Sequence, residues 1–222
     1  MPLSTFPKAV LFDWDNTLVD TWPLIHGAMR VVFEKRSLTP WTIEQVKERC
    51  HESGREAFPK MFPDSWRSAL DDFYAYAREH HIAQIQLLPF AQELIKHLVY
   101  LDIPIVLVSN KTKALIVKEV DYLQLTDHFV SVIGAGDAVH DKPNAAPVQL
   151  ALERLGIEAS MDVWMIGDTP ADWSAAKAAG VCAIGVGGAN IGEHAEKPHL
   201  MCLDLEPICN ALGLYIKAER KM

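Results

Sequence analysis

Lys8 to Asp20, read as KAVLFDWDNTLVD, place two carboxylates one residue apart, at Asp13 and Asp15, directly after an apolar run. In a strand, alternate side chains share a face, so both carboxylates would point the same way. Two like charges this close repel each other unless a cation or a shared proton compensates them. A solvated turn would also accommodate Asp and Asn, so this stretch alone leaves both interpretations open.

Other polar side chains follow further apolar runs of strand type. Ser109 and Asn110 end IPIVLVSN, and Asp168 ends DVWMIGD, with Asp172 one helical turn later. Lys142 lies in the proline-bounded loop HDKPNAAP, ahead of the DVWMIGD run. Each residue alone is explained equally well as a cap, a turn residue or a solvated side chain. Their coincidence at one predicted sheet edge favours a shared site.

The chemistry that these groups compose is phosphoryl transfer. Several convergent carboxylates suit a hard divalent cation such as Mg²⁺, which takes octahedral oxygen ligands. A hydroxyl and backbone N–H groups can hold phosphate oxygens, and a lysine can offset the remaining negative charge. One carboxylate can attack phosphorus and form an aspartyl-phosphate, while its neighbour moves the proton.

The elements that must position these groups alternate between helix and strand from about residue 90. We expect helices over 91–101, 112–125, 145–157, 170–180 and 206–220, and strands over 103–110, 129–137, 162–168 and 181–188. Continuous apolar strands alternating with helices indicate a parallel sheet covered on both faces, a doubly wound α/β domain. In such sheets, ligands bind beyond the carboxyl ends of the strands.

Residues 20–87 show helical patterns of apolar residues without the alternation of helix and strand, and we expect them to form a helical insert after the first strand. Helical spacing of apolar residues predicts helices over 21–36 and 65–81. We expect Thr39 to be the N-cap and Pro40 the first helical residue, opening a helix that continues over 41–50. No strand is expected here. The predicted domains are therefore a core of residues 1–19 and 88–222 and an insert of residues 20–87.

Composition limits the possible partners. The chain has 222 residues and a formal net charge of −8, with no Lys/Arg block, so nucleic acid is not expected as a partner. No apolar run approaches the ~20 residues that span a bilayer, and the first residues lack the pattern of a secretory signal. Four scattered cysteines favour free thiols in a reducing, cytoplasmic compartment.

Four motifs, DWDNT, VSN, DKP and GDTPAD, resemble those of the haloacid dehalogenase superfamily in order and spacing. FDWDNTLVD and GDTPADWSAAKAAG resemble especially its phosphoglycolate phosphatase-like branch. The resemblance covers nearly the whole predicted core. It implies a phosphatase acting on a small phosphorylated metabolite, with the helical insert as a mobile cap.

The resemblance also implies residue roles. Asp13 is then the nucleophile and Asp15 the general acid and base. Mg²⁺ is held by Asp13, the backbone carbonyl of Asp15 and Asp168, and Asp172 ligates it through water or orients its ligands. Ser109, Lys142 and backbone donors of Asn110 bind the transferring phosphoryl group. Together with the metal ligands, these residues form the predicted site.

Three further positions are less regular. Position 14 is Trp where relatives more often have a smaller aliphatic residue, and position 16 is Asn where Gly is common. We expect Trp14 to face away from the two carboxylates and to pack against the first hinge of the insert. SGRE (53–56) lies between two insert helices, where relatives place a loop that reaches the site; Arg55 is its candidate substrate contact, and an exposed turn is the alternative.

Two other functions remain open at this stage. A sugar-phosphate mutase shares the first chemical step but protects its phosphoenzyme from water. A non-enzymatic, phospho-accepting signalling domain also uses an acidic pocket and Mg²⁺, but has no use for Asp15 or for an insert of this size. A dehalogenase would not need Asp15, and a phosphonatase would need a lysine in the insert for a Schiff base, whereas Lys35, Lys47 and Lys60 read as surface residues.

Overall fold

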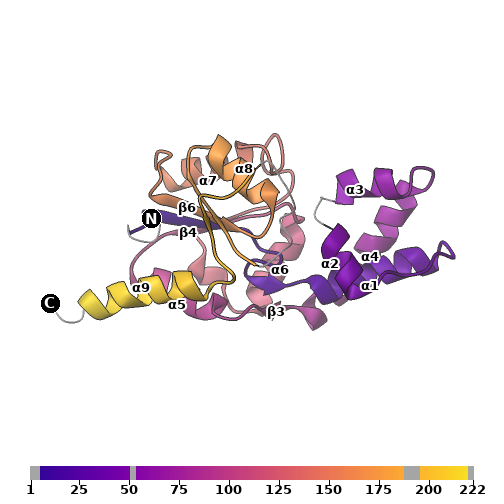
Figure 1. The fold of residues 1–222 in the computed structure, drawn as a ribbon, viewed down its shortest axis with the longest axis horizontal. Coiled ribbons are helices and arrows are strands. Elements are labelled where there is room, and N and C mark those ends of the chain that lie inside the picture. Colours follow the sequence, from indigo (N-terminus) through magenta and orange to yellow (C-terminus); the bar gives the residue numbers. More distant parts are fainter. Residues whose placement is uncertain (1–5, 51–53, 188–195, 220–222) are drawn as a thin grey trace. The chain divides into compact units, whose positions relative to one another are not determined.

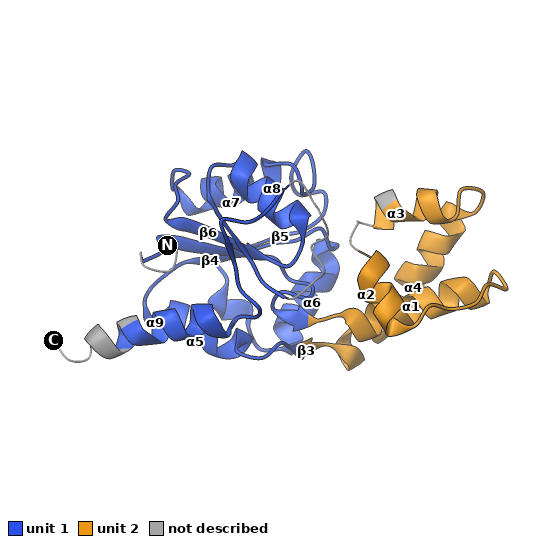
Figure 2. Cartoon of the chain, viewed as in Figure 1, with its two compact units in different colours: residues 1–19, 87–222 blue, residues 20–86 orange. Residues whose placement is uncertain are grey.

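The computed structural model describes residues 6–50, 54–187 and 196–219, and the chain divides into two compact units (Figure 2). The core unit comprises residues 1–19 and 87–222, and the helical unit comprises residues 20–86. Among the described residues, no helix is long and apolar enough to cross a membrane.

A six-stranded sheet forms the centre of the core unit, in the order β5-β4-β1-β6-β7-β8. Every neighbouring pair is parallel, and Val10 of β1 is in register with Ile105 of β4 on one side and with Trp164 of β6 on the other. The strands are β1 (Ala9–Phe12), β4 (Ile105–Val108), β5 (Ser131–Ile133), β6 (Val163–Gly167), β7 (Cys182–Gly185) and β8 (Leu200–Met201). The predicted parallel α/β fold is confirmed.

Helices cover both faces of this sheet. They are α5 (Ala91–Tyr100), α6 (Lys113–Tyr122), α7 (Ala146–Leu155), α8 (Pro170–Ala178) and α9 (Glu206–Glu219), with a short 3₁₀ helix η2 (Thr126–His128). In Figure 1, α7 and α8 lie on one face, and α5 and α9 on the other. Because both faces are covered, the strands are apolar at successive positions rather than at alternate ones.

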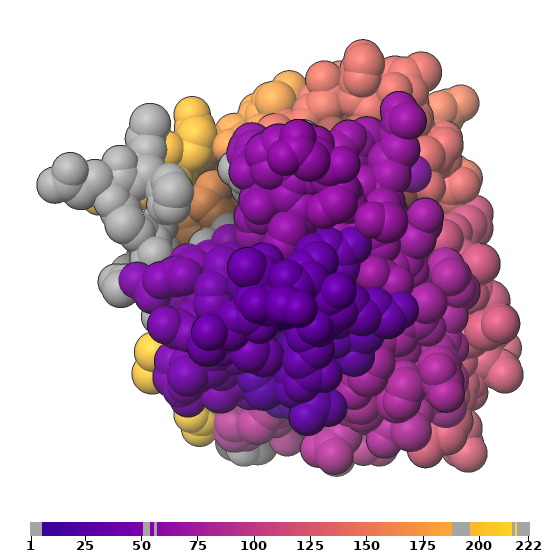
Figure 3. Space-filling model, turned by 90° about the vertical axis from the view of Figure 1, so that its right-hand side faces the viewer, coloured from indigo at the N-terminus to yellow at the C-terminus, as the bar shows by residue number. Residues whose placement is uncertain are grey.

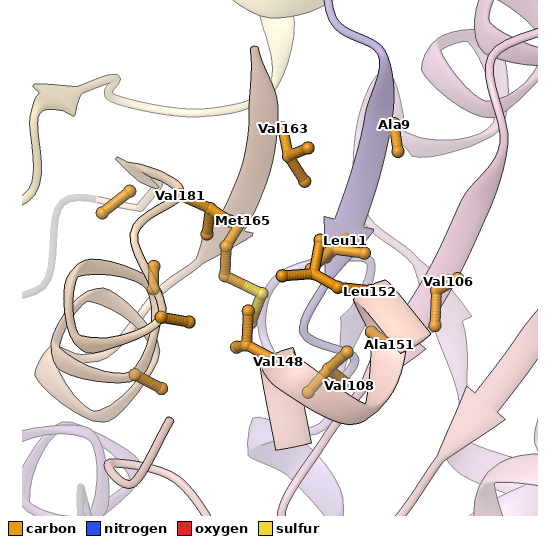
Figure 4. Packing of buried hydrophobic residues seen from close by; sticks show 14 of the residues in the cluster. Ala9, Leu11, Val106, Val108, Val148, Ala151, Leu152, Val163, Met165 and Val181 are labelled. Atoms are coloured by element: carbon orange, nitrogen blue, oxygen red, sulfur yellow. The ribbon is translucent and has the colours of Figure 1, made fainter. Parts of the chain in front are cut away.

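Packing under α7 and α8 shows the two-residue period of a strand. Ala9 and Leu11 of β1 point into the same cluster as Met165 of β6 and Val148 of α7 (Figure 4). Val10, between them in the chain, is equally inaccessible to solvent. β1 is therefore buried on both faces of the sheet.

The helical unit contains α1 (Trp22–Glu34), α2 (Ile43–Arg49), α3 (Gly54–Met61) and α4 (Trp66–Gln84). Its own apolar core consists of Met29, Val32, Phe33, Val46, Phe58, Phe62 and Ala69. The indigo and purple atoms of Figure 3 show the surface that these helices present on one side. Short strands β2 (Val19–Asp20) and β3 (Gln86–Leu87) pair where the chain leaves the core unit and returns to it.

Three expectations for this region were wrong. The second helix begins at Ile43 rather than after Thr39, because the Thr42 side chain accepts a hydrogen bond from the Gln45 N–H, and the Gln45 side chain accepts one from the Thr42 N–H. SGRE is not a loop: Gly54 opens α3, which tolerates Pro59 inside it; Ser53 lies outside the described residues. Strand β3 was not expected at all.

Candidate active site

Polar side chains follow three neighbouring strands of the core unit at their carboxyl ends. The Asp13 N–H, just past β1, still donates to the carbonyl of Ile166 in β6, at 2.9 Å. The Ser109 N–H, just past β4, donates to the carbonyl of Ile133 in β5, at 3.0 Å. Asp168 directly follows β6. The sheet ladder therefore extends into the residues that carry the candidate chemistry and fixes their backbone.

The carboxyl groups of Asp13, Asp168 and Asp172 form one cluster, in which an oxygen from each lies within 4.8 Å of the others. Asp13 and Asp172 are buried. The Thr17 hydroxyl lies between two members, 3.4 Å from Asp13 Oδ2 and 3.4 Å from Asp168 Oδ1. Because carboxylate oxygens are the donors that Mg²⁺ prefers, this set fits that cation chemically.

The surroundings of the cluster raise the pKa values of two of its carboxyl groups. Burial raises the pKa of Asp13 from its ordinary 3.8 to about 7; Lys142 opposes the shift, and the charges of Asp172 and Asp15 add to it. Burial and the neighbouring Asp13 likewise raise the pKa of Asp168 well above its usual value. A divalent cation bound to these carboxylates would favour their ionised forms and so lower both pKa values.

Lys142 is the cation inside this cluster. Its Nζ donates to Asp13 Oδ1 at 2.7 Å, to Asp172 Oδ1 at 2.6 Å and to the carbonyl of Val108 at 2.7 Å. Burial disfavours its charge, but the two carboxylates outweigh that cost and raise the pKa of Lys142 above its ordinary value. A charged ammonium group thus lies directly beside Asp13, the predicted nucleophile.

Asn110 has a role that the sequence did not reveal. Its Nδ2 donates to the carbonyl of Lys142 at 2.8 Å, and the Lys142 N–H donates to Asn110 Oδ1 at 2.9 Å. This pair of bonds joins the end of β4 to the loop that carries Lys142. The side chain of Asn110 therefore positions Lys142, while the predicted use of its backbone as a phosphate donor stays a prediction.

Asp172 connects the cluster to the first turn of α8. Its Oδ2 accepts hydrogen bonds from the Thr169 N–H at 3.0 Å and from the Thr169 hydroxyl at 2.7 Å. Its Oδ1 accepts from Lys142. Both oxygens of Asp172 thus have protein partners, which matches the predicted orienting role better than direct ligation of a cation.

The turn between β1 and β2 explains one departure from the family pattern. Asn16 has φ +58°, in the left-handed region that Asn tolerates better than most residues other than Gly. The Asn16 N–H donates to the carbonyl of Val19 at 2.7 Å, and the carbonyl of Trp14 accepts from the Leu18 N–H at 3.0 Å. Asn at position 16 thus permits the same tight turn as glycine.

Trp14 packs against two residues of the core unit. Its fully buried indole N–H donates to Glu119 Oε2 on α6 at 2.6 Å, and its ring meets Phe129 edge to face, with centroids 6.4 Å apart. Both partners belong to the core unit rather than to a hinge of the insert. These contacts give Trp14 the expected packing role, with partners on α6 and just after η2, while packing against the first hinge of the insert stays a prediction.

Two charged residues beside Asp15 escaped the sequence analysis. Lys111 Nζ lies 2.9 Å from Asp15 Oδ1 and 2.8 Å from Glu119 Oε1, and Glu119 has no exposed surface. Burial disfavours the charge of Lys111, but Asp15 and Glu119 together raise its pKa. A signal was present, since Glu119 falls among buried Ile116 and Val120 on the inner face of α6.

Arg55 lies in the other unit, exposed in the first turn of α3. Of the predicted site residues, the core unit brings together those of the strand ends and the Lys142 loop, and Arg55 is not among them. Its contact with a substrate stays a prediction.

Comparison with known proteins gives a consistent picture. A family model described as haloacid dehalogenase-like hydrolase matches residues 10–186. A phosphoglycolate phosphatase from Chromobacterium violaceum is 31% identical to this chain, over 81% of this chain and 85% of its own length. One from Yersinia pestis is also 31% identical, over 93% of this chain and 94% of its own length. A crystal structure of a HAD-superfamily hydrolase from Ehrlichia chaffeensis is 26% identical, with a TM-score of 0.66, and covers 96% of this chain and 98% of its own.

Proposed function

The chain belongs to the haloacid dehalogenase-like hydrolase family as a phosphatase, and we propose that it hydrolyses a small phosphorylated metabolite through an aspartyl-phosphate with Mg²⁺ as cofactor. The observation that carries this proposal is the buried group of Asp13, Asp168 and Asp172 around the ammonium of Lys142. It supplies a nucleophile, a set of hard oxygen donors and a fixed positive charge in one place.

In the proposed reaction, Asp13 attacks phosphorus and a new bond forms between its carboxylate oxygen and the phosphoryl group. The bond to the leaving oxygen breaks, and Asp15 gives that oxygen its proton. Asp15 then takes a proton from water, which attacks phosphorus, breaks the bond to Asp13 and releases inorganic phosphate. Ser109 and Lys142 hold the phosphoryl oxygens during both steps, and the side chain of Asn110 keeps Lys142 in place.

Mg²⁺ would be held by Asp13, the backbone carbonyl of Asp15 and Asp168, and would neutralise the phosphoryl oxygens when bound. Burial, together with the neighbouring carboxylates, raises the pKa values of Asp13 and Asp168, and a bound cation would favour the ionised forms that the proposed reaction needs. Asp172 would orient these groups through Lys142 and through the start of α8.

Phosphoglycolate is the first substrate to test, since relatives 31% identical to this chain bear the name phosphoglycolate phosphatase. We propose that the helical unit serves as a mobile cap over the site. Free Cys50, Cys182, Cys202 and Cys209 support a reducing, cytoplasmic location.

The test is release of inorganic phosphate from a panel of phosphomonoesters that includes phosphoglycolate and hexose phosphates, with Mg²⁺ and with excess EDTA. We expect turnover that needs Mg²⁺. Full turnover in EDTA would contradict the metal assignment. Conversion of one hexose phosphate isomer into another would point to a mutase, and a phosphoenzyme that never turns over would point to a signalling domain.

A further inference from the structure

Four side chains beside the proposed site form a closed circuit of short polar contacts. Lys111 Nζ donates to Asp15 Oδ1 at 2.9 Å and lies 2.8 Å from Glu119 Oε1. Glu119 Oε2 accepts from the indole N–H of Trp14 at 2.6 Å. Trp14 and Asp15 are neighbours in the chain, so the backbone closes the circuit.

Burial of the charged groups in this circuit costs free energy of desolvation. Glu119 has no exposed surface, and the side chain of Lys111 is 12% exposed. Ion pairs of this kind often stabilise a fold no better than apolar residues of similar volume, because each charge loses its hydration. A packing role for α6 would therefore need only apolar side chains at these positions. The circuit instead fixes its most accessible member, the partly buried Asp15 carboxyl group.

Lys111 also touches the neighbouring phosphate-binding residue. Its backbone N–H donates to the Ser109 hydroxyl oxygen at 3.2 Å. One residue thus orients both the predicted proton carrier and a predicted phosphate ligand. A lysine side chain is flexible, so this function requires the second carboxylate, Glu119, which holds the ammonium group from the buried side.

We propose that Lys111 and Glu119 are positioning residues for proton transfer by Asp15: Lys111 orients the Asp15 carboxyl group, and Glu119, held by Trp14, orients Lys111. The inference rests on the proposed phosphatase function. It assigns a task to a lysine that is distinct from Lys142, whose partners are Asp13 and Asp172. Displacement of a reacting group by about 1 Å can cost a hundredfold in rate.

The experiment compares kcat/KM for two aryl esters, phenyl phosphate and 4-nitrophenyl phosphate, in the presence of Mg²⁺. Because 4-nitrophenolate leaves without a proton and phenolate leaves poorly without one, only 4-nitrophenyl phosphate bypasses proton donation by Asp15. In Lys111→Met, we expect kcat/KM for phenyl phosphate to fall about tenfold further than for 4-nitrophenyl phosphate, which is part of the ~10²–10⁴ that a positioned general acid supplies. Glu119→Gln should shift the ratio in the same direction.

Lys113→Met is the matched control. Lys113 stands two residues along and also pairs with a carboxylate, Asp137 at 2.9 Å, but its side chain is 41% exposed. The Lys113→Met variant should leave the ratio of kcat/KM for the two esters unchanged. Lys111→Arg, which keeps the charge, should restore most of the ratio that Lys111→Met loses.

Equal losses on both esters would overturn the proposal and assign Lys111 to folding. A rise in KM for both esters, with weaker inhibition by inorganic phosphate, would overturn it in favour of phosphate binding. If Lys111→Met does not fold, Trp14→Phe and Lys111→Arg decide: no change of the ratio in Trp14→Phe would contradict the circuit. A wild-type protein that releases phosphate from neither the aryl esters nor the phosphomonoester panel would refute the proposed function itself, whereas an active wild type with insensitive variants refutes only this inference.

Discussion

Gly167 and Asp172 are so close that a side chain at one excludes the carboxyl group of the other. A Cβ built on Gly167, the last residue of β6, would overlap the carboxyl carbon of Asp172 in the first turn of α8. Asp172 cannot retreat without losing Thr169 and Lys142, its hydrogen-bond partners. The absence of a side chain at 167 is therefore a condition for the carboxylate cluster.

Gly167→Ala should accordingly destabilise the protein and lower its activity together. Forcing a methyl group into a packed interior costs about 1–3 kcal/mol, and displacement of Asp172 also loosens Lys142. Thermal unfolding and phosphate release measure the two effects. Gly213→Ala in α9 is the control, since its added Cβ meets only the His97 ring, at 3.3 Å, and alanine favours a helix by about 1 kcal/mol. A Gly167→Ala protein with normal activity would show that Asp172 can move freely.

Asp15→Asn should nearly abolish turnover of alkyl phosphates, because the leaving alkoxide then receives no proton. Acetyl phosphate has a leaving group that needs none, so Asp13 should still attack it. The variant should accumulate phosphate on Asp13, since the second step lacks its base. Intact-mass measurement should show one added phosphate. Asp13→Asn is the control and should trap none; trapping there, or wild-type turnover in Asp15→Asn, would reverse the assignment of the two carboxylates.

Asp168→Asn should raise the concentration of Mg²⁺ needed for half-maximal turnover. The change removes one negative charge and leaves an amide oxygen, a weaker ligand for a hard cation. A metal titration of phosphate release measures it, with Asp162→Asn, a surface carboxylate paired with Lys8, as control. An unchanged titration would remove Asp168 from the metal site.

Stability without metal should depend on pH through Asp13. The folded state raises the pKa of Asp13 from 3.8 to about 7, so it holds the proton more tightly than the unfolded chain does. This contribution to stability is complete below about pH 4 and is lost as the pH rises through about 7. In EDTA, Tm of Asp13→Asn relative to wild type should therefore increase from about pH 5 to about pH 8.

Added Mg²⁺ should reverse that trend. A cation favours the ionised form of Asp13, so its stabilisation of the wild type should be larger at about pH 8 than at about pH 6. Parallel pH profiles of wild type and Asp13→Asn would show that Asp13 titrates alike in the folded and unfolded states.

Arg55→Ala should weaken turnover of the preferred substrate far more than turnover of 4-nitrophenyl phosphate. The reason is that an exposed cation at the start of α3 suits a substrate whose leaving group carries a charged substituent such as a carboxylate, and the 4-nitrophenyl group carries none. Arg30→Ala is the control: Arg30 is an exposed arginine of α1 whose carboxylate partner, Glu34, lies 3.9 Å away. Equal losses on both substrates would assign Arg55 to the fold of the helical unit.

Much of the core unit was predictable because its strands are buried on both faces and end in polar residues. Asp13, Ser109 and Asp168 each mark the point where an apolar run stops. Three strand ends at one edge of a parallel sheet follow from topology alone, and the positions of these residues needed no knowledge of side-chain contacts.

The parts that were not predictable depend on contacts between distant residues. The position of Glu119 on the apolar face of its helix was a signal, but the sequence does not reveal that Trp14 and Lys111 meet it there. Helix α3 was missed because Gly54 and Pro59, residues that usually interrupt helices, stand inside it, and packing of Phe58 in the core of the helical unit overrides them.

The central place of β1 in the sheet has a consequence for synthesis of the chain. β1 is made first, yet its two neighbours, β4 and β6, begin only at Ile105 and Val163. On the ribosome, the apolar segment with Asp13 at its end therefore waits, unpaired, while the helical unit emerges and folds from contacts within residues 20–86. Asp13, the proposed nucleophile, acquires its surroundings only when β6 arrives, so a truncated nascent chain carries this aspartate without the rest of the proposed site.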